Sequence, residues 1–310
     1  MPIIAYQSLN SNSSTDHGIS ASNSQHFTRM THDQLAMNSD PWNLVLPTAP
    51  DISPDIPVQG PAELRSTASS GYMDKGQHSN DSFSSMVANK VRQIYQNLIR
   101  AFGGVDLLVC GELDSSHSDW TSMQSNAGQL IHTSAPSKAC NCFSVHSTNG
   151  TANKFLGEGD GWLAMACHNI IVVFVHVPNS IAKSEDSLMS YYQKINSVVI
   201  QVGLGPIDVV MGDTNQPTND FTARVLSRAL GIKFSDAHPG GSINPFDSHQ
   251  RSFDGTNSTA TKKYDVAVYN TTSLKLAEVV YLSQSTPVTG GGRYSAAVTD
   301  HMGIGLRIEK

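Results

Sequence analysis

The sequence has few cysteines and none in the spacing of a metal site. Its four cysteines, Cys110, Cys140, Cys142 and Cys167, are too sparse for a disulfide scaffold and lack the paired CxxC pattern of a zinc site. We expect most of them to be reduced, with Cys110 and Cys167 buried beside apolar runs and Cys140 and Cys142 in a loop. A catalytic cysteine is the less favoured interpretation.

Long apolar runs are also missing. No run approaches the roughly 18 to 20 residues that are needed to cross a bilayer. The N-terminal segment MPIIAYQSLN has no basic region and turns polar quickly, so it does not resemble a secretory signal. We therefore predict a soluble protein, cytoplasmic where it is made and without membrane insertion, and export by a route that needs no cleaved signal stays open.

Positive charge is not in excess either. The chain has 20 basic and 26 acidic residues, a net charge of −6 at pH 7. Such a chain has no global positive field with which to collect polyanions, which argues against a protein that simply coats nucleic acid. A nuclease is not excluded, because carboxylates that hold a divalent cation recruit phosphate through the metal.

The pattern along the chain indicates one large α/β core. The 310 residues, 39% of them apolar, suffice for one domain or at most two. After a short strand at 3–6, the segment from about 11 to 82 is rich in Ser, Asn and Pro, which predicts an insertion that is either disordered or laid over the fold. A helix is expected to end at Gly103-Gly104, because apolar residues recur at three and four positions before it: Met86, Val87, Val91, Ile94, Tyr95, Leu98 and Phe102.

Short buried strands and helices follow the glycine pair. Strands are predicted at 105–111, 169–177, 206–212, 264–270, 276–282 and 302–308, and a helix at about 184–201. This mixture favours a sandwich of sheets flanked by helices. Polar residues follow several of these strands or precede the last one: Glu112, His176, Asp213, Asn215 and the pair Asp300-His301. Each alone is more often a cap or a solvated loop residue, but active sites are commonly assembled at such strand ends.

The order of these motifs is more specific than any one of them. GDTN at 212–215, YDVAVYN at 264–270 and TDH at 299–301 together resemble the endonuclease/exonuclease/phosphatase superfamily, over residues 2–7 and about 105–310. DLLVCGELDSSH at 106–117 is most similar to the deoxyribonuclease-I-like branch. The resemblance implies a single four-layer α/β sandwich, two mixed β-sheets flanked by helices, that carries the 11–82 insertion.

The resemblance also implies a metal site. Glu112 and Asp300 match the family's metal-binding carboxylates, and Gln7 stands where the family has an asparagine, with Asn10 as the alternative amide. Mg²⁺ or Mn²⁺ held by oxygen ligands would neutralise the charge that develops when a phosphodiester is attacked. Acidic side chains gathered without a cation would repel one another, which is a separate reason to infer one.

Five further residues take catalytic positions in the same pattern. Asp213 and Asn215 match the pair that contacts the scissile phosphate and the metal or attacking water, and His176 matches the histidine that assists the leaving oxygen. His301 and Asp265 match the pair in which a carboxylate orients the imidazole that activates water.

Several positions depart from the family pattern. Gly111 replaces a glutamine, Thr299 replaces a serine, and Asp114 stands where the deoxyribonuclease branch has a basic residue. The acidic partner of His176 is not assigned by the pattern, with Glu158 and Asp160 in the GEGDG segment as candidates. That segment and GGGR at 290–293 are interpreted as turns, and the candidate phosphate contacts near the motifs are Arg251, Lys262, Lys263 and Arg293.

The sequence therefore predicts a Mg²⁺- or Mn²⁺-dependent endonuclease that hydrolyses DNA. A Ser- and Asn-rich insertion, low charge and no signal would suit a toxin or effector. A phosphoinositide or phospholipid phosphoesterase of the same fold is the first alternative, and a catalytically inactive binding module is the second. A specific protein inhibitor is compatible with these roles, but no residue pattern indicates one.

Overall fold

The computed structural model describes part of the chain. The described residues are 1–9, 26–31, 95, 98–99, 102–113, 129–133, 142–147, 153–202, 204–216, 221–237, 264–283, 285–287, 295–297 and 303–310. Apart from 26–31, the expected insertion at 11–82 lies outside these ranges. So do Asn10, Cys140, Asp300 and His301.

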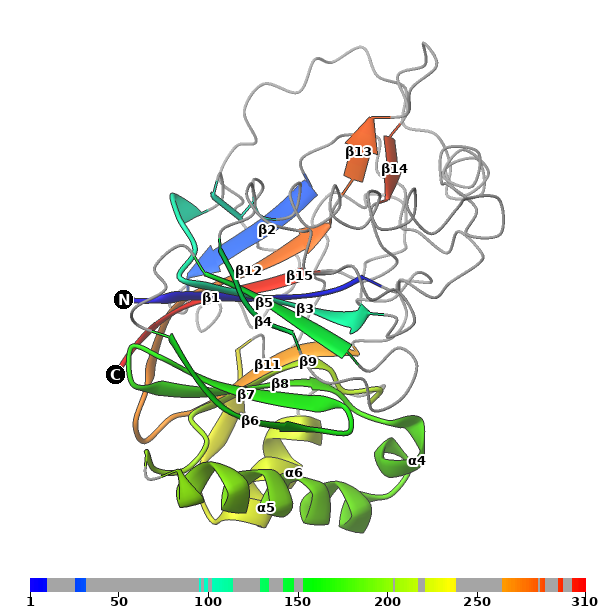
Figure 1. Cartoon of the computed structure of the whole chain (residues 1–310), viewed down its shortest axis with the longest axis vertical. Coiled ribbons are helices and arrows are strands. Elements are labelled where there is room, and N and C mark those ends of the chain that lie inside the picture. The colour runs from blue at the N-terminus through cyan, green and yellow to red at the C-terminus, as the bar shows by residue number, and fades with distance from the viewer. Residues whose placement is uncertain are drawn as a thin grey trace, which may run out of the picture.

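Two mixed sheets form the centre of the molecule (Figure 1). The seven-stranded sheet has the order β2 (His26–Thr31), β12 (Lys275–Ser283), β15 (Gly303–Glu309), β1 (Ile3–Ser8), β3 (Leu107–Leu113), β5 (Cys142–Ser147) and β4 (Gln129–Thr133). The six-stranded sheet has the order β10 (Phe234–Asp236), β11 (Asp265–Asn270), β9 (Val209–Asp213), β8 (Ile170–His176), β7 (Trp162–Cys167) and β6 (Asn153–Gly159). β13 (Ser285–Pro287) and β14 (Ser295–Ala297) pair separately. Each large sheet has one parallel pair among its described strands, β1 with β3 and β8 with β9.

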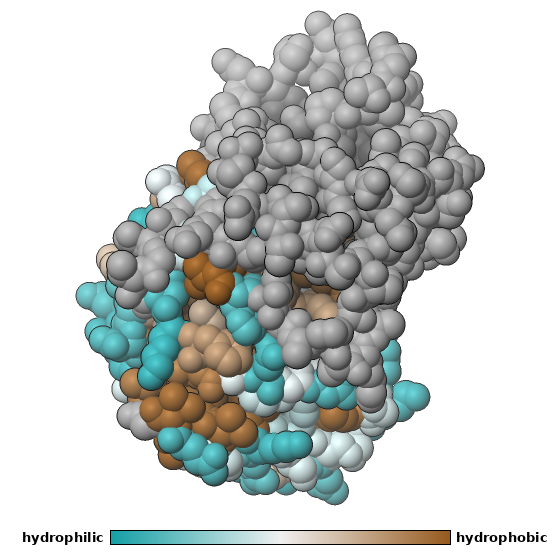
Figure 2. Space-filling view, in the orientation of Figure 1, coloured by the Kyte–Doolittle hydropathy of each residue, from teal (hydrophilic) through white to brown (hydrophobic). Residues whose placement is uncertain are grey.

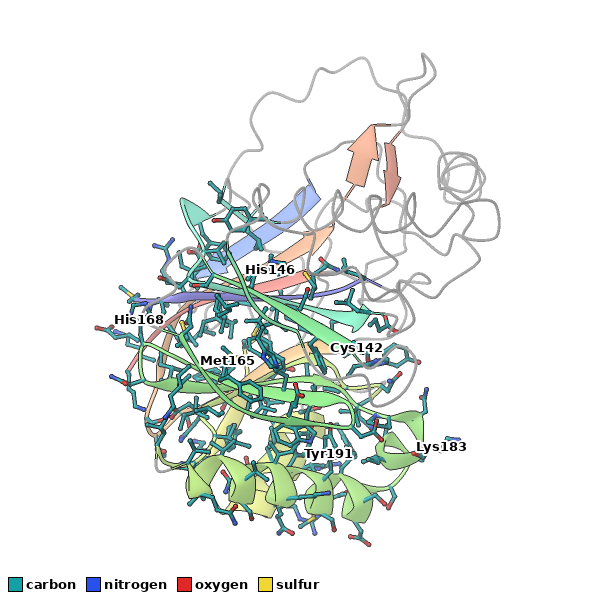
Figure 3. The ribbon with its side chains drawn as sticks, viewed as in Figure 1. Cys142, His146, Met165, His168, Lys183 and Tyr191 are labelled. Carbon is teal, nitrogen blue, oxygen red and sulfur yellow. The ribbon has the colours of Figure 1, made fainter. Side chains whose placement is uncertain are left out.

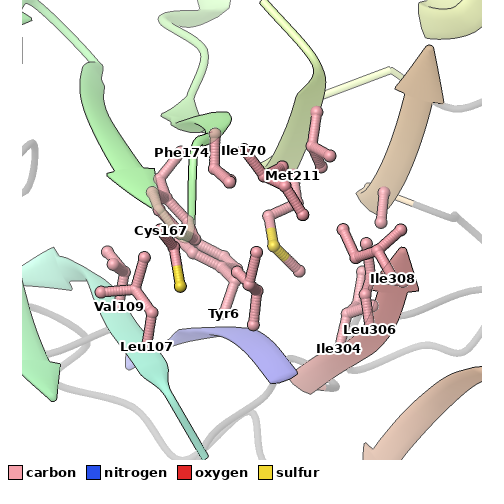
Figure 4. Close-up of a cluster of buried hydrophobic side chains, with 14 of the residues drawn as sticks. Tyr6, Leu107, Val109, Cys167, Ile170, Phe174, Met211, Ile304, Leu306 and Ile308 are labelled. Carbon is pink, nitrogen blue, oxygen red and sulfur yellow. The ribbon is translucent and has the colours of Figure 1, made fainter. Parts of the chain in front are cut away.

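The two sheets pack face to face on an apolar layer (Figure 4). Because side chains alternate between the faces of a strand, every second residue of a strand points into this layer. On β1 these residues are Ile4 and Tyr6, on β8 they include Val172 and Phe174, and on β9 they include Met211. The rings of Tyr6 and Phe174 stack with their centroids 6.4 Å apart, which joins the two sheets.

Helices cover the outer face of the six-stranded sheet (Figure 1). α4 (Asn179–Ala182) follows β8, and α5 (Glu185–Gln201) and α6 (Phe221–Leu230) pack on the sheet. Ser184 caps the start of α5 by accepting the Ser187 backbone N–H at 3.4 Å. The buried face of α5 recurs at three and four residues, as an amphipathic helix requires: Leu188, Tyr191, Tyr192, Ile195 and Val199.

The outer face of the seven-stranded sheet also meets helical residues. Leu98 and Phe102 are helical and buried, and both lie against Gly305 of β15, where an added Cβ would overlap the Phe102 ring. The Gly103 N–H bonds the Ile99 carbonyl at 2.7 Å, and Gly103 has a φ of 80°, so glycine ends this helix as predicted. The four layers confirm the predicted fold class.

Most predicted elements are present, and several were missed. The structure confirms the strands expected at 3–6, 105–111, 169–177, 206–212, 264–270, 276–282 and 302–308 and the helix expected at about 184–201, with ends that differ by up to three residues. β5, β6, β7 and α6 were not predicted, and Gly157–Gly159 belong to β6 rather than to a turn. Cys142 was expected in a loop, but it begins β5 and is buried, because β5 lies between β3 and β4. β2 lies within the segment that was interpreted as loop-like.

Apolar side chains also reach the surface at one end of the layers (Figure 2). Phe155 on β6 and Ile200 at the end of α5 are 40% and 48% exposed. Among the described residues, no helix is long and apolar enough to cross a membrane.

Candidate active site

Polar residues continue the inward-facing rows of the sheets where the apolar layer ends. By strand alternation, Ser8 follows Ile4 and Tyr6 on β1, and His176 follows Val172 and Phe174 on β8. In the same way Asp213 follows Met211 on β9, and Asp265 precedes Ala267 on β11. The sheets therefore direct four polar side chains to one edge of the space between them.

Strand register aligns three of these side chains. His176 is the parallel partner of Asp213, and Asp213 is the antiparallel partner of Asp265. Partnered residues point to the same face of a sheet, so the three form a row across β8, β9 and β11. Asp213 and Asp265 are 2% and 0% exposed, so both carboxylates have been removed almost entirely from bulk water.

Glu112 joins the row from the other sheet. The register of β3 with β5 shifts between Cys110 and Leu113, and Glu112 has a φ of 55°. A left-handed backbone is unfavourable for glutamate, and such conformations cluster at functional sites. By strand alternation Gly111 faces the space between the sheets, as Leu107 and Val109 do. The irregularity that follows lets the Glu112 side chain face this space as well. Glu112 Oε1 lies 3.5 Å from Nε2 of His176.

Glu112, His176 and Asp213 form a group that fits a divalent metal ion. One ligand atom from each lies within 4.8 Å of the others, and His176 Nε2 is 4.0 Å from Asp213 Oδ2. Two carboxylates and an imidazole provide oxygen and nitrogen ligands of the kind that bind Mg²⁺ or Mn²⁺. A third carboxylate, Asp265, lies beside Asp213 in the row. This much negative charge at a buried edge favours a bound cation.

Asn215 lies two residues after the end of β9 and has a left-handed backbone, with a φ of 53°. Its backbone N–H donates to Asp213 Oδ1 at 2.8 Å, and its side-chain amide donates to the Val177 carbonyl at 2.8 Å. The amide nitrogen therefore joins the loops that follow β8 and β9. Asn215 fixes one oxygen of Asp213, and its side-chain carbonyl remains an acceptor that could face a ligand.

The position of His176 is supported by the turn between β6 and β7. The His176 backbone N–H donates to the Gly161 carbonyl at 2.9 Å, and the Tyr191 hydroxyl donates to the same carbonyl at 2.9 Å. Figure 3 shows Tyr191 between α5 and the sheet. Gly161 has a φ of 73°, and an added Cβ would overlap the His176 carbonyl oxygen. The turn therefore requires glycine at this point.

Tyr6 is a site residue that the sequence analysis missed. It is fully buried, and its pKa is raised well above the ordinary value, first by burial and then by the nearby carboxylates of Asp265, Asp213 and Glu112. Its hydroxyl therefore stays protonated beneath the acidic group. A Cβ added at Gly111 would overlap this hydroxyl, so the glycine at this position makes room for the tyrosine.

Gln7 points away from the acidic group. Strand alternation places it on the outer face of β1, where its amide donates to the Ser8 carbonyl at 3.0 Å. Its Oε1 lies against Gly303, where an added Cβ would overlap it. Ser8, the next residue, reaches Glu112 with its hydroxyl. The structure thus brings Ser8 rather than Gln7 beside the predicted carboxylate.

The other candidates from the sequence are placed elsewhere or lie outside the described residues. Glu158 contacts Nε2 of His132 at 2.9 Å, whereas the carboxylates near His176 are Glu112 and Asp213. The Asp160 carbonyl accepts from Tyr191 at 3.3 Å. Outside the described residues lie Asn10, Arg251, Lys262, Lys263, Arg293, Asp300 and His301.

The chain is similar to known proteins in structure but not in sequence. No family model and no curated protein matches the sequence. An endonuclease/exonuclease/phosphatase family protein from Bacteroides thetaiotaomicron is similar, with 12% identity and a TM-score of 0.48 over 74% of this chain and 93% of that one. A mannosyl-6-phosphatase from the same organism has 11% identity and a TM-score of 0.47 over 75% and 96%. A 3′-5′ exonuclease from Neisseria meningitidis has 16% identity and a TM-score of 0.44 over 72% and 96%.

Proposed function

We propose that this protein is a divalent-metal-dependent phosphodiesterase that cleaves DNA internally. The observation that carries the proposal is the group Glu112, His176 and Asp213, whose ligand atoms lie within 4.8 Å of one another at the edge of the two sheets. Glu112 comes from the seven-stranded sheet, and His176 and Asp213 come from the six-stranded sheet. A cluster of metal ligands beside groups that move protons promotes the hydrolysis of an anionic ester.

The residues divide the chemistry between them. Glu112 and Asp213 would hold Mg²⁺ or Mn²⁺ together with Asp300, and the bound metal would supply charge neutralisation at the phosphate. His176 Nε2 lies 3.5 Å from Glu112 Oε1 and 4.0 Å from Asp213 Oδ2, and in this proposal it hydrogen-bonds the leaving oxygen while the carboxylates hold the metal. Asp265, buried at the start of β11, would orient His301 so that its imidazole takes a proton from water.

His301 is included because of where β15 begins. β15 starts at Gly303, and the next residue, Ile304, pairs with Tyr6 near the carboxyl end of β1. The strand thus begins at the edge of the sheet at which Ser8 and Glu112 lie. His301 stands two positions before this strand in the sequence, within the TDH motif.

Cleavage of supercoiled plasmid tests the proposal. Purified protein should nick the plasmid with Mg²⁺ or Mn²⁺ and not with EDTA, and His176→Ala and His301→Ala should each abolish most of the nicking. His168→Ala is the matched control, because His168 is an exposed histidine that contacts Asp106. In Figure 3 it lies on the side of the sheets opposite α4, which follows β8.

The outcomes separate the alternatives. Nicking that needs metal and both histidines supports the endonuclease. Intact plasmid in Mg²⁺ and Mn²⁺ would rule out DNA cleavage, and turnover of phosphoinositides or RNA would then give the substrate class. A protein that binds Mn²⁺ and hydrolyses none of these substrates would be the binding module.

A further inference from the structure

Ser8 and Glu112 are 104 positions apart in the chain and meet at the end of the parallel pair β1 and β3. The Ser8 hydroxyl donates a hydrogen bond to Glu112 Oε2. The other carboxylate oxygen, Oε1, lies 3.5 Å from His176 Nε2. Ser8 therefore holds one carboxylate oxygen of Glu112, and the other oxygen faces His176.

The environment of Ser8 suits a fixed hydrogen bond. Ser8 is 0% exposed, so water does not compete for its hydroxyl. Because the serine side chain is short, fixing it in one rotamer costs little conformational entropy. Register places Ser8 opposite Gly111, the residue before Glu112. A hydrogen bond to an ionised carboxylate in such a place is stronger than a neutral one.

The charge of Glu112 makes this contact consequential. Glu112 follows a break in the β3 register and has a left-handed backbone, so regular strand geometry does not aim its side chain. A partner is needed to hold the carboxylate toward His176 and Asp213 against repulsion from the neighbouring aspartates. The amide of Gln7 lies on the other face of β1 and donates to the Ser8 carbonyl.

We propose that Ser8 is a positioning residue of the metal centre, and that its hydroxyl, rather than the Gln7 amide, holds Glu112 in the orientation that binds the cation. The inference rests on the proposed function in taking this group as a metal site. Partners that orient metal ligands typically change metal affinity by about 10- to 100-fold when they are removed.

Calorimetric titration with Mn²⁺ tests the inference without any substrate. Ser8→Ala should weaken Mn²⁺ binding about 10- to 100-fold, and Ser8→Thr, which keeps the hydroxyl, should retain most of the affinity. Gln7→Ala should weaken binding less than Ser8→Ala does. Ser144→Ala is the matched control, because Ser144 is equally buried on β5 and its hydroxyl contacts His146 instead.

A double-mutant cycle distinguishes positioning from a general structural effect. If Ser8 acts through Glu112, Ser8→Ala should weaken Mn²⁺ binding in the wild-type background and add nothing in Glu112→Ala. Equal weakening in both backgrounds would overturn the inference. Ser8→Cys keeps most of the buried volume with only a weak donor, so it repeats the test if Ser8→Ala does not fold.

Two failures can be told apart. Wild-type protein that binds no Mn²⁺ contradicts the metal site, and with it the proposed function. Wild-type protein that binds Mn²⁺, with Ser8→Ala binding it equally well, contradicts only the role of Ser8.

Discussion

Asp208 directly precedes β9 and Asp213 ends it, and the two have different surroundings although both are buried, with 3% and 2% exposed. Asp208 accepts hydrogen bonds from the Ile171 backbone N–H at 3.0 Å, the Ser273 hydroxyl at 2.8 Å and Lys310 Nζ at 3.1 Å. The negative charge of Asp208 is therefore stabilised by hydrogen-bond donors of the protein, one of which, Lys310, is a cation.

Asp213 accepts the Asn215 backbone N–H at Oδ1, and its neighbours include other acidic side chains. It shares its edge with Glu112 and Asp265, and His176 Nε2 is 4.0 Å from its Oδ2. A buried carboxylate among its own donors stabilises the fold, whereas one grouped with other carboxylates is favourable only when a cation is bound. Asp208 thus has the surroundings of a structural aspartate, and Asp213 has those that the proposed metal site requires.

The largest expected difference is in catalysis. Asp213→Asn should lower the rate of plasmid nicking at saturating Mg²⁺ by about 10³-fold, the upper range for removing one stabilising group from a transition state. Asp208→Asn should leave the rate at 25 °C unchanged, because the described contacts of the Asp208 side chain are with Ile171, Ser273 and Lys310 and not with Glu112, His176 or Asp213. Similar losses in both variants would mean that the two aspartates are not functionally distinct. Initial rates at matched protein concentration provide the measurement.

Stability should respond in the opposite sense. Asp208→Ala leaves the buried donors of Ile171 and Ser273 without this acceptor, which we expect to cost about 3 kcal/mol in the free energy of unfolding. Asp213→Ala should cost little in metal-free protein, because it removes repulsion with Glu112 and Asp265. Urea denaturation in EDTA measures both. A larger loss for Asp213→Ala would show that its backbone and side-chain contacts outweigh the repulsion.

The sequence indicates candidate site residues most directly where a polar residue ends an apolar strand. His176 and Asp213 end apolar strands, and the strand register that joins them follows from the parallel pair β8 and β9. Asp265 needed the family pattern, since an aspartate at a strand start has many structural uses. Asp208 was not singled out, because Ser273 and Lys310 reach it from distant parts of the chain.

Ser8 and Tyr6 were missed for a different physical reason. β1 is buried from Ile4 to Ser8 on both faces, so its sequence lacks the polar alternation that would show which residues face the other sheet. The family pattern then drew attention to Gln7. Only the packing of Tyr6 against Phe174 in the apolar layer shows that the inward row contains Tyr6 and Ser8.

Metal binding should stabilise the folded protein through Asp213 and not through Asp208. A ligand that binds the folded state at 100 times its dissociation constant adds about 2.7 kcal/mol, so Mn²⁺ should raise the melting temperature of wild-type protein and of Asp208→Asn. It should not raise that of Asp213→Asn. Differential scanning calorimetry with Mn²⁺ and with EDTA makes the comparison, and an equal shift in all three proteins would place the cation elsewhere.

The smallest expected effect concerns the one cation among the described partners of Asp208. Lys310 contacts Asp208 with a side chain that is 44% exposed, so solvent screens the pair, and Lys310→Met should cost less than about 1 kcal/mol. The difference from wild type should shrink in high salt, since screening already weakens exposed pairs. Urea denaturation at low and high salt measures it. A loss as large as that of Asp208→Ala would mean that the lysine charge, rather than the neutral donors, holds Asp208, and that charge neutralisation alone distinguishes Asp208 from Asp213.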